Sequence, residues 1–231
     1  MCASKNPKRS DKGLGLYSGA RIKDYLDQIS LDFIEEKSFE GVLPVVIEFG
    51  CGAGTHTVRM AQMGAHVVGV DIDASVTRDL IKKVSLHKLI DPERIDLIEK
   101  DWRLLSGKDL PNEIDALFSQ RSLSYLSFEQ VRALLFLCAY NMKEEALFFI
   151  SLNGIESLYG VDHPQRELPV QERFGVLSKK MQKVLNVSNP VCVYDEQDVP
   201  LVFEGTGFVI EEIKKTPFGN FQVKGVFKKR I

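Results

Sequence analysis

A glycine-rich turn constrains the fold of this chain more than any other feature. Residues 50–54 read Gly-Cys-Gly-Ala-Gly, after an apolar, β-branched run at 45–49 and before a helical pattern at 55–63. Glycines permit a positive φ and remove side chains, so the backbone can turn sharply and a ligand can lie against it. The helix that follows offers unpaired N–H groups to a carboxylate or phosphate. The turn therefore predicts a strand–turn–helix unit with a ligand site at the end of the strand.

Strand and helix patterns alternate along the rest of the chain. Short apolar runs typical of buried strands recur at 66–70, 95–98, 114–118 and 146–152, and helical patterns at 21–37, 74–89 and 128–140. Such alternation favours parallel strands joined by right-handed crossovers, with helices on both faces of the sheet. Two further runs, 208–214 and 221–228, flank a turn-rich segment and predict an antiparallel C-terminal hairpin. We therefore expect an α/β, doubly wound, mostly parallel sheet.

Composition narrows the classes of partner. The 231 residues include 30 basic and 32 acidic side chains, a formal net charge of -2, which argues against a nucleic-acid partner held by phosphate neutralisation. The four cysteines and four histidines are scattered, without the spacing of a zinc site or a disulfide framework. No apolar run is long enough to span a bilayer, and none follows the basic N-terminus as in a secretory signal. We expect a cytoplasmic protein with no metal and no membrane partner.

The spacing within the turn separates two classes of ligand. A dinucleotide fingerprint needs GxGxxG or GxGxxA, but the last position is Thr55 counted from Gly50 and Thr57 counted from Gly52. The pattern is instead acidic-x-Gly-x-Gly-x-Gly, made by Glu48, Gly50, Gly52 and Gly54. In these residues the chain resembles the class I S-adenosylmethionine-dependent methyltransferases. The resemblance implies S-adenosyl-L-methionine as cofactor, S-adenosyl-L-homocysteine as product, and a seven-stranded sheet whose last strand is antiparallel.

The expected domain organisation is simple. Residues 1–16 read as a flexible tail and residues 17–231 as a single methyltransferase domain. The resemblance implies that the helical segment 17–40 folds over the cofactor as a lid. The stretch 153–198 is too long for a simple connection, so we expect extra helix there, for example at 171–185, and a cap over the acceptor pocket.

Acidic residues at the ends of neighbouring strands extend the site. Asp71 ends the second strand, 21 positions after Gly50, where a carboxylate can accept hydrogen bonds from both ribose hydroxyls. The resemblance implies that Asp101 accepts from the adenine amino group and that the backbone N–H of Trp102 meets the adenine ring. Trp102 and Ile72 are candidates for covering the two faces of the adenine, and each is alternatively a core residue.

The methionine end of the cofactor has its own candidates. Glu48 is expected to accept from the methionine ammonium, or from backbone N–H groups of its own turn, because a buried carboxylate needs partners. Cys51 lies in the turn beside the cofactor. Ser119 and Gln120 follow the fourth strand and are expected at the methionine end, and Tyr17 belongs to the lid.

The acceptor side is expected where the fourth and fifth strands end. Methyltransferases of this class that act on nucleobase or glutamine amino groups often carry [DNS]-P-P-[YF] after the fourth strand, but this chain has no proline at Gln120 or Arg121. Arg121 is a candidate partner for an anionic group of the substrate, or else a surface arginine. His163 is the candidate base because of its pKa range, or else a loop histidine.

The cap and the near-neutral charge favour a small-molecule acceptor. We predict methyl transfer to such an acceptor by direct in-line displacement. The alternatives are an RNA or protein methyltransferase and a non-catalytic S-adenosylmethionine-binding module, whereas the glycine register disfavours a nucleotide-dependent oxidoreductase. The sequence indicates neither the accepting atom nor the oligomeric state.

Overall fold

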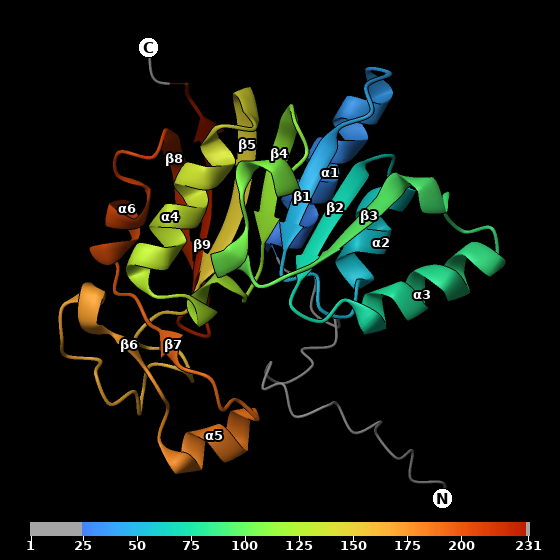
Figure 1. Cartoon of the computed structure of the whole chain (residues 1–231). Helices are drawn as coiled ribbons and strands as arrows, with labels where there is room; N and C mark the ends of the chain where they lie inside the picture. The colour runs from blue at the N-terminus through green and yellow to red at the C-terminus, as the bar shows by residue number, and fades with distance from the viewer. Residues whose placement is uncertain (1–24, 230–231) are drawn as a thin grey trace, which may run out of the picture.

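The computed structural model describes residues 25–229. Seven strands form one sheet and two short strands form another (Figure 1). The strands are β1 (Val45–Phe49), β2 (His66–Asp71), β3 (Ile95–Glu99), β4 (Ile114–Ser119), β5 (Met142–Leu152), β6 (Phe174–Gly175), β7 (Val191–Cys192), β8 (Phe208–Lys215) and β9 (Phe221–Phe227). The α-helices are α1 (Tyr25–Phe39), α2 (Thr55–Gln62), α3 (Ser75–Leu86), α4 (Phe128–Ala139), α5 (Lys179–Leu185) and α6 (Asp198–Phe203).

The large sheet has the strand order β3-β2-β1-β4-β5-β9-β8. Strands β1 to β5 pair in parallel, whereas β9 pairs antiparallel with both β5 and β8. The predicted seven-stranded, doubly wound sheet with an antiparallel C-terminal hairpin is therefore confirmed. The chain runs outward from β1 to β3 and returns to β4 on the other side of β1. That reversal creates a crevice at the carboxyl ends of β1 and β4, where open α/β sheets bind their ligands.

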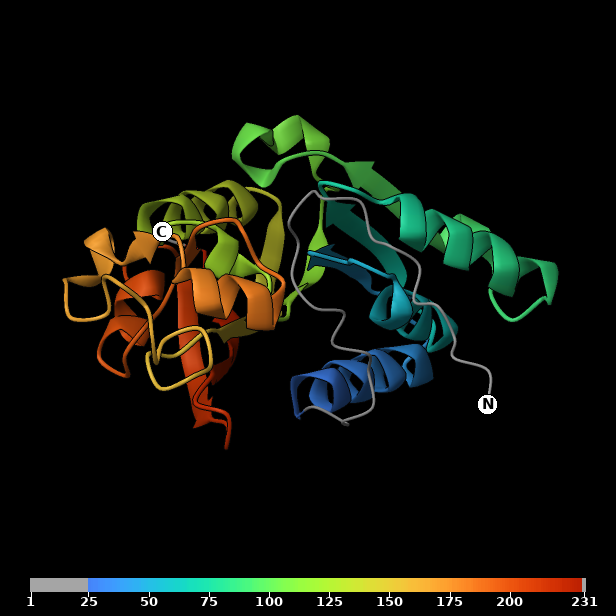
Figure 2. The same ribbon diagram turned by 90° about the horizontal axis from the view of Figure 1, so that it is seen from below.

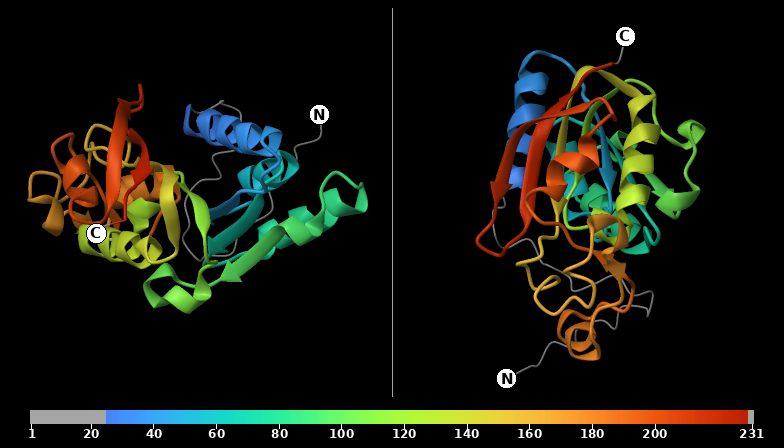
Figure 3. Two further views of the ribbon diagram at one scale, coloured as in Figure 1. Left: turned by 90° about the horizontal axis from the view of Figure 1, so that it is seen from above. Right: turned by 90° about the vertical axis from the view of Figure 1, so that its left-hand side faces the viewer.

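Alternating side chains of the central strands supply two hydrophobic cores, one on each face of the sheet. Ile47 and Phe49 pack with residues of α4 and α6, while Val46 packs with residues of α1 and α2. Figure 3 shows α1 and α2 on one side of the sheet and α4 on the other. Because alternate strand residues point to opposite faces, Glu48 faces the same side as Val46, toward α1 and α2.

The segment after β5 forms a separate small structure beyond the carboxyl ends of the strands, on the β5–β9 side (Figures 1 and 2). It contains β6, β7 and α5, with its own core of Leu177, Met181, Leu185, Val187 and Val191. The helix expected at 171–185 is confined to Lys179–Leu185. It begins late because Ser178 caps it by accepting from the Met181 N–H, and because Gly175 pairs with Val191 in a strand.

A buried ion pair ties this segment to the rest of the domain. The Arg173 guanidinium donates to the Asp198 carboxylate at the start of α6, and both residues are less than a tenth exposed. The Asp195 N–H donates to the same carboxylate at 2.7 Å. Helix α6 was not predicted from the sequence. Within residues 25–229 no helix is long and apolar enough to cross a bilayer.

Candidate cofactor and acceptor site

The glycine turn adopts the backbone conformation that its sequence predicts. Gly50, Gly52 and Gly54 have φ values of 79°, 53° and 75°, a region where a side chain costs energy and glycine does not. The Gly50 N–H donates to the Val70 carbonyl at 2.7 Å, which closes the turn against β2. Gly54 precedes Thr55, the first residue of α2. The turn therefore lies at the switch point of the sheet.

The glycines also allow the turn to pack closely against neighbouring loops. A Cβ on Gly50 would collide with the Ser122 side chain, and one on Gly54 would collide with Thr77 of α3. The Thr77 hydroxyl also donates to the Gly52 carbonyl at 2.8 Å. Neither Ser122 nor Thr77 was predicted as a neighbour of the turn, because nothing in the local sequence pattern shows which hydroxyl residues reach it.

Asp71 is held directly against the turn. Its carboxylate accepts from the Gly52 N–H at 2.8 Å and from the Asp73 N–H at 3.1 Å, and the residue is 7% exposed. A carboxylate has about four acceptor positions, so it can take ribose hydroxyls alongside two backbone donors. The structure thus brings Asp71 and the glycine turn together at one edge of the sheet, as the motif spacing predicts.

Glu48 is buried below the turn. The Thr57 hydroxyl, from the first turn of α2, donates to its carboxylate at 2.5 Å. Burial raises the pKa of Glu48 to about 7, and the Thr57 hydrogen bond partly opposes this rise. The negative charges of Asp27 and Asp71 raise the pKa further. Among the described residues no turn N–H donates to this carboxylate, and its donor is a hydroxyl, that of Thr57, which was not anticipated from the sequence.

Helix α1 adds a polar cluster beside Glu48. Asp27 and Ser30 are buried on its inner face, and the Ser30 hydroxyl lies 3.0 Å from His56 Nε2. His56 Nδ1 lies 3.9 Å from the Asp27 carboxylate, and the imidazole packs on the Phe118 ring with centroids 4.3 Å apart. Burial lowers the pKa of His56 to about 3, so the ring is neutral at physiological pH.

The residues expected around the adenine lie after β2 and β3. Ile72 is 43% exposed next to Asp71. Trp102 packs edge-on against Phe49, with ring centroids 5.7 Å apart, and its indole N–H is buried without a hydrogen-bond partner among the described residues. The Asp101 carboxylate accepts from the guanidinium and the backbone N–H of Arg103, which holds the pKa of Asp101 below its usual range. Asp101 is therefore ionised and already paired.

Of the residues at the end of β4 and after it, Ser119 bonds within the sheet, whereas Gln120 and Ser122 belong to the loop beside the turn. Ser119 is fully buried and donates to the Phe49 carbonyl at 3.0 Å, so its hydroxyl joins β4 to β1 rather than facing the expected methionine end. Gln120 accepts from the Arg121 guanidinium at 3.1 Å, and its buried Nε2 has no partner within residues 25–229. The Ser122 hydroxyl donates to the Gln120 carbonyl, which holds this loop against the turn.

Arg121 lies where the loops after β4 and β5 meet. Its φ is 57°, and its backbone N–H donates to the Ser151 hydroxyl at 2.6 Å. The side chain is exposed, and its positive charge acts on the half-buried Tyr159, which is hydrogen-bonded to Tyr125. Burial raises the pKa of Tyr159. A cationic side chain and two tyrosines thus lie close together in the loops after β4 and β5.

His163 does not have the geometry expected of a base. The residue is 3% exposed, with Nε2 3.1 Å from the Val191 carbonyl and Nδ1 accepting from the Gln165 N–H at 3.2 Å. Both ring nitrogens are therefore used by backbone groups, and burial lowers the pKa. The imidazole joins the loop after β5 to β7, and we do not carry it forward as a proton acceptor.

Cys51 is also buried, with its sulfur 3.6 Å from the Thr77 hydroxyl. Burial raises the pKa of this thiol far above its usual value, so it remains protonated and is a poor nucleophile. Among the described residues no group of three or more potential metal ligands is present. Tyr17 and the first part of the expected lid lie outside the described residues.

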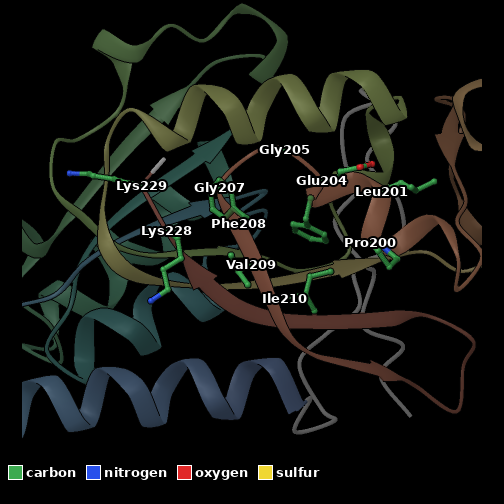
Figure 4. Close-up of a pocket in the computed structure, with 11 residues that line it drawn as sticks. Pro200, Leu201, Glu204, Gly205, Gly207, Phe208, Val209, Ile210, Lys228 and Lys229 are labelled. Carbon is green, nitrogen blue, oxygen red and sulfur yellow. The ribbon is translucent and has the colours of Figure 1, made fainter. Parts of the chain in front are cut away.

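A pocket elsewhere in the molecule lies between α6 and the start of β8 (Figure 4). Phe208 and Lys228 border it. Because β9 runs antiparallel to β5 and Lys228 directly follows its last residue, this pocket lies at the opposite edge of the sheet from the glycine turn. It is bordered by none of the predicted site residues, so it is not part of the candidate site.

Several known proteins with similar sequence or structure are methyltransferases. A family model described as a methyltransferase domain matches residues 46–145. A ubiquinone biosynthesis O-methyltransferase of Xylella fastidiosa is 29% identical over 131 residues, covering 54% of this chain and 48% of that protein. A ribosomal RNA small subunit methyltransferase A of Thermotoga petrophila is 33% identical over 99 residues, covering 40% and 35%. The chain thus spans about half or less of these curated relatives.

A structural comparison agrees. The magnesium protoporphyrin IX methyltransferase of Synechocystis, solved with bound S-adenosylhomocysteine, matches with a TM-score of 0.57 at 18% identity, over 88% of this chain and 84% of that one. The match shows that the fold is shared. It agrees with the family prediction made from the pattern between Glu48 and Gly54, which the methyltransferase-domain match confirms. Residues 46–145 thus match a methyltransferase domain, which supports the predicted resemblance to the class I S-adenosylmethionine-dependent methyltransferases.

Proposed function

We propose that this chain binds S-adenosylmethionine at the carboxyl edge of the sheet and transfers its methyl group to a small molecule. The observation that carries the proposal is the joining of the Asp71 carboxylate to the Gly52 N–H at the switch point. This contact holds a carboxylate that can accept hydrogen bonds from ribose hydroxyls directly beside a glycine-rich turn. The relatives support the reaction class, since an O-methyltransferase and a porphyrin methyltransferase are among them.

The residues present fit an adenosine ligand with an amino-acid tail. Asp71 would hold the ribose hydroxyls, and Ile72 and Trp102 would lie against the adenine. The buried indole N–H of Trp102 and the buried Nε2 of Gln120, which have no partner in the described part of the chain, are donors that a polar ligand would satisfy. Glu48 would face the ammonium, with Thr57 fixing its orientation.

The cofactor, when bound, supplies an electrophilic methyl group on a sulfonium. The protein's own contribution is to align the acceptor with that group and to exclude water. A protein base is needed only if the acceptor atom carries its proton at neutral pH. Neither His163 nor His56 offers an accessible basic nitrogen, so we propose catalysis by positioning.

The proposal of a small-molecule acceptor depends on the position of the segment 153–198. Two bonds pin the loop after β4 to the end of β5, one from the Arg121 N–H to Ser151 and one from the Asn153 N–H to Ser124 at 3.1 Å. The small core containing Met181 packs against Tyr125 and Tyr159, next to this loop. A cap fixed so close to the crevice restricts access for a duplex or a folded protein. Arg121 would pair with an anionic group of the substrate.

Isothermal titration calorimetry tests the cofactor. We expect S-adenosylhomocysteine to bind and NAD not to bind. Asp71→Ala should weaken the binding of S-adenosylhomocysteine by well over tenfold, because a charged acceptor for two hydroxyls is lost. Asp79→Ala, which removes an exposed carboxylate of α3, serves as the matched control and should leave the affinity unchanged. An unaltered dissociation constant in Asp71→Ala would remove Asp71 from the site.

A transfer assay tests the acceptor. The protein is incubated with S-adenosylmethionine tritiated on its methyl group and with cell extracts fractionated by size. We expect label to enter the low-molecular-weight fraction. Label confined to RNA or to protein would contradict the small-molecule acceptor while supporting methyl transfer, and label in no fraction would favour a non-catalytic binding module.

A further inference from the structure

Two glycines hold the tip of the β8–β9 hairpin against the loop that leaves β5. A Cβ on Gly154 would collide with the Gly219 carbonyl oxygen, and one on Gly219 would lie 2.6 Å from the backbone of Glu156. Gly219 also has a φ of 74°, a conformation that favours glycine. The two backbones therefore touch, and Figures 1 and 3 show the hairpin tip beside this loop.

Three exposed apolar side chains gather at this contact. Phe218, at the hairpin tip, is 64% exposed, and Leu158 and Val161 in the loop are 62% and 53% exposed. The Val161 N–H donates to the Ser157 carbonyl at 3.0 Å, so the loop makes one helical turn that places Leu158 and Val161 on the same side. Phe218 directly precedes Gly219, which meets the backbone of Ser157. We call Leu158, Val161 and Phe218 the apolar patch.

The charges beside the apolar patch do not favour an anionic partner. Glu156 and Lys215, which border the hairpin contact, pair with each other at 2.7 Å and so carry no net charge together. Asp162, next to Val161, adds an exposed acidic side chain. A nucleic acid or an anionic membrane surface gains no electrostatic attraction from such a surface. Contiguous exposed apolar side chains instead mark a site for an apolar ligand.

Polar groups lie on the inner side of the same turn. Tyr159 stands between Leu158 and Val161 in sequence, but it is half-buried and hydrogen-bonded to Tyr125 of the loop after β4. The positive charge of Arg121 acts on Tyr159. One helical turn thus presents a tyrosine toward a guanidinium and two aliphatic side chains toward the solvent.

The loop that carries Arg121 reaches the glycine turn. The Arg121 N–H donates to Ser151 at the end of β5 at 2.6 Å. The next residue, Ser122, lies so close to the turn that a Cβ on Gly50 would collide with it. The cationic side chain of Arg121 therefore lies between the proposed cofactor site and the turn that carries the apolar patch.

We propose that the methyl acceptor is an amphiphilic anion, with its anionic head on Arg121 beside Tyr159 and its apolar part lying along the apolar patch. The proposal rests on the proposed function and names the substrate class of the same site. A guanidinium can hold a carboxylate with two hydrogen bonds, which fixes the head. The apolar patch adds affinity in proportion to the apolar area that it covers.

Calorimetry with straight-chain acids tests this class of acceptor, with S-adenosylhomocysteine present at saturation. Butanoate and octanoate share a carboxylate head and differ only in chain length. A fully buried methylene raises the affinity about fourfold, and the apolar patch covers only one side of a chain. We therefore expect octanoate to bind at least about tenfold more tightly than butanoate. Equal affinities would overturn the proposal.

The charge of the head has its own control. Octylammonium carries an apolar chain of the same length and the opposite charge, so Arg121 should repel it. We expect it to bind at least about tenfold more weakly than octanoate. Binding of octylammonium as tight as that of octanoate would overturn the assignment of Arg121 to an anionic head.

Substitutions separate the head from the chain. Phe218→Ser combined with Leu158→Ser should lower the affinity for octanoate about tenfold and leave that for butanoate unchanged. Arg121→Gln should weaken the binding of both acids to the same extent. Phe39→Ser, which removes a side chain that is 92% exposed on α1, is the matched control and should change neither affinity. A chain-length effect that persists in the double variant would overturn the proposal.

Two further measurements test other places for the apolar chain. Leu201→Ser alters the pocket between α6 and β8 and should leave octanoate binding unchanged, whereas loss of binding would place the ligand in that pocket and overturn the proposal. Sedimentation with phosphatidylglycerol vesicles should leave the protein in solution. Vesicle binding that is lost in Phe218→Ser would make the apolar patch a membrane contact and would also overturn it.

The outcomes separate this proposal from the proposed function. If S-adenosylhomocysteine binds but octanoate binds no more tightly than butanoate, the amphiphilic acceptor is overturned and the cofactor assignment stands. Failure of the wild-type protein to bind S-adenosylhomocysteine at all would contradict the proposed function itself.

Discussion

Glu48→Gln should make the cofactor-free protein more stable at alkaline pH. Burial raises the pKa of Glu48 from 4.5 to about 7. Between these two pH values the folded protein holds a proton that the unfolded chain has released, so the free energy of unfolding falls as pH rises. Above about pH 7 the carboxylate is ionised in both states, and the full cost of burying it is present. A neutral glutamine avoids that cost.

The expected difference in the free energy of unfolding follows from the interval between the two pKa values of Glu48. One pH unit corresponds to about 1.4 kcal/mol, so the interval from 4.5 to about 7 corresponds to about 3 kcal/mol at pH 8. Below pH 4.5 the carboxyl is protonated in both states, and the difference between the two proteins should nearly vanish. Glu48→Gln would thus stabilise the protein at alkaline pH while removing the proposed partner of the cofactor's ammonium group. Such an opposition between stability and function is expected at a strained functional site.

Urea denaturation of the cofactor-free protein at pH 4.5, 6 and 8 measures this effect. Glu35→Gln, an exposed carboxylate of α1, is the control and should show a small, pH-independent change. If Glu48→Gln were as stable as the wild type at pH 8, or if the difference did not grow between pH 4.5 and 8, the reasoning about the buried carboxylate would be refuted.

Three further predictions concern the turn, the cap and the histidine. Gly41→Ala should lower the free energy of unfolding by about 1–2 kcal/mol, because Gly41 has a φ of 75° but open space around it. Gly50→Ala adds a collision with Ser122, so it should lower the free energy of unfolding further and abolish S-adenosylhomocysteine binding. Equal effects of the two substitutions would contradict the packing argument. Asp198→Ala should lower the free energy of unfolding, measured in urea, by about 3–5 kcal/mol, because it leaves Arg173 buried without its partner. Glu156→Ala, which removes the exposed ion pair with Lys215, should lower it by less than about 1 kcal/mol. His163→Gln should lower stability by about 1–3 kcal/mol through its lost backbone hydrogen bonds, but leave the pH profile of methyl transfer unchanged; a lost inflection would restore His163 as a base.

Much of the fold was predictable because it depends on local periodicity. The run at 45–49, the turn at 50–54 and the alternation of strands and helices recur in the structure within a few residues of the expected bounds. Strand β5 begins earlier than expected, at Met142, since a register shift near Glu145, with a φ of 65°, lets a charged segment join the sheet. The charged residues at the start of β5 carry no apolar pattern that would identify them as strand residues.

The cap was less predictable because its contacts link distant residues. A helix over 171–185 satisfies the local pattern, but Arg173 turns away to reach Asp198, 25 residues later. Likewise, His163 is a reasonable candidate base by residue type, and only the fold shows that Val191 occupies one of its nitrogens.

Within the site, the strand-end residues were identified by their spacing from the turn. Glu48 and Asp71 both occupy the carboxyl edge, as their positions after apolar runs suggest. The partners that set their chemistry were not identified. Thr57 and Asp27 come from two helices, and whether a helical residue faces a given strand end depends on how the helix docks.

A crystal structure of the protein with S-adenosylhomocysteine tests the central claim most directly. We expect the nucleoside at the turn between Gly50 and Gly54, with its ribose hydroxyls on Asp71 and its ammonium beside Glu48. Density for the nucleoside at another place, or the same crevice empty in crystals grown with saturating ligand, would contradict it.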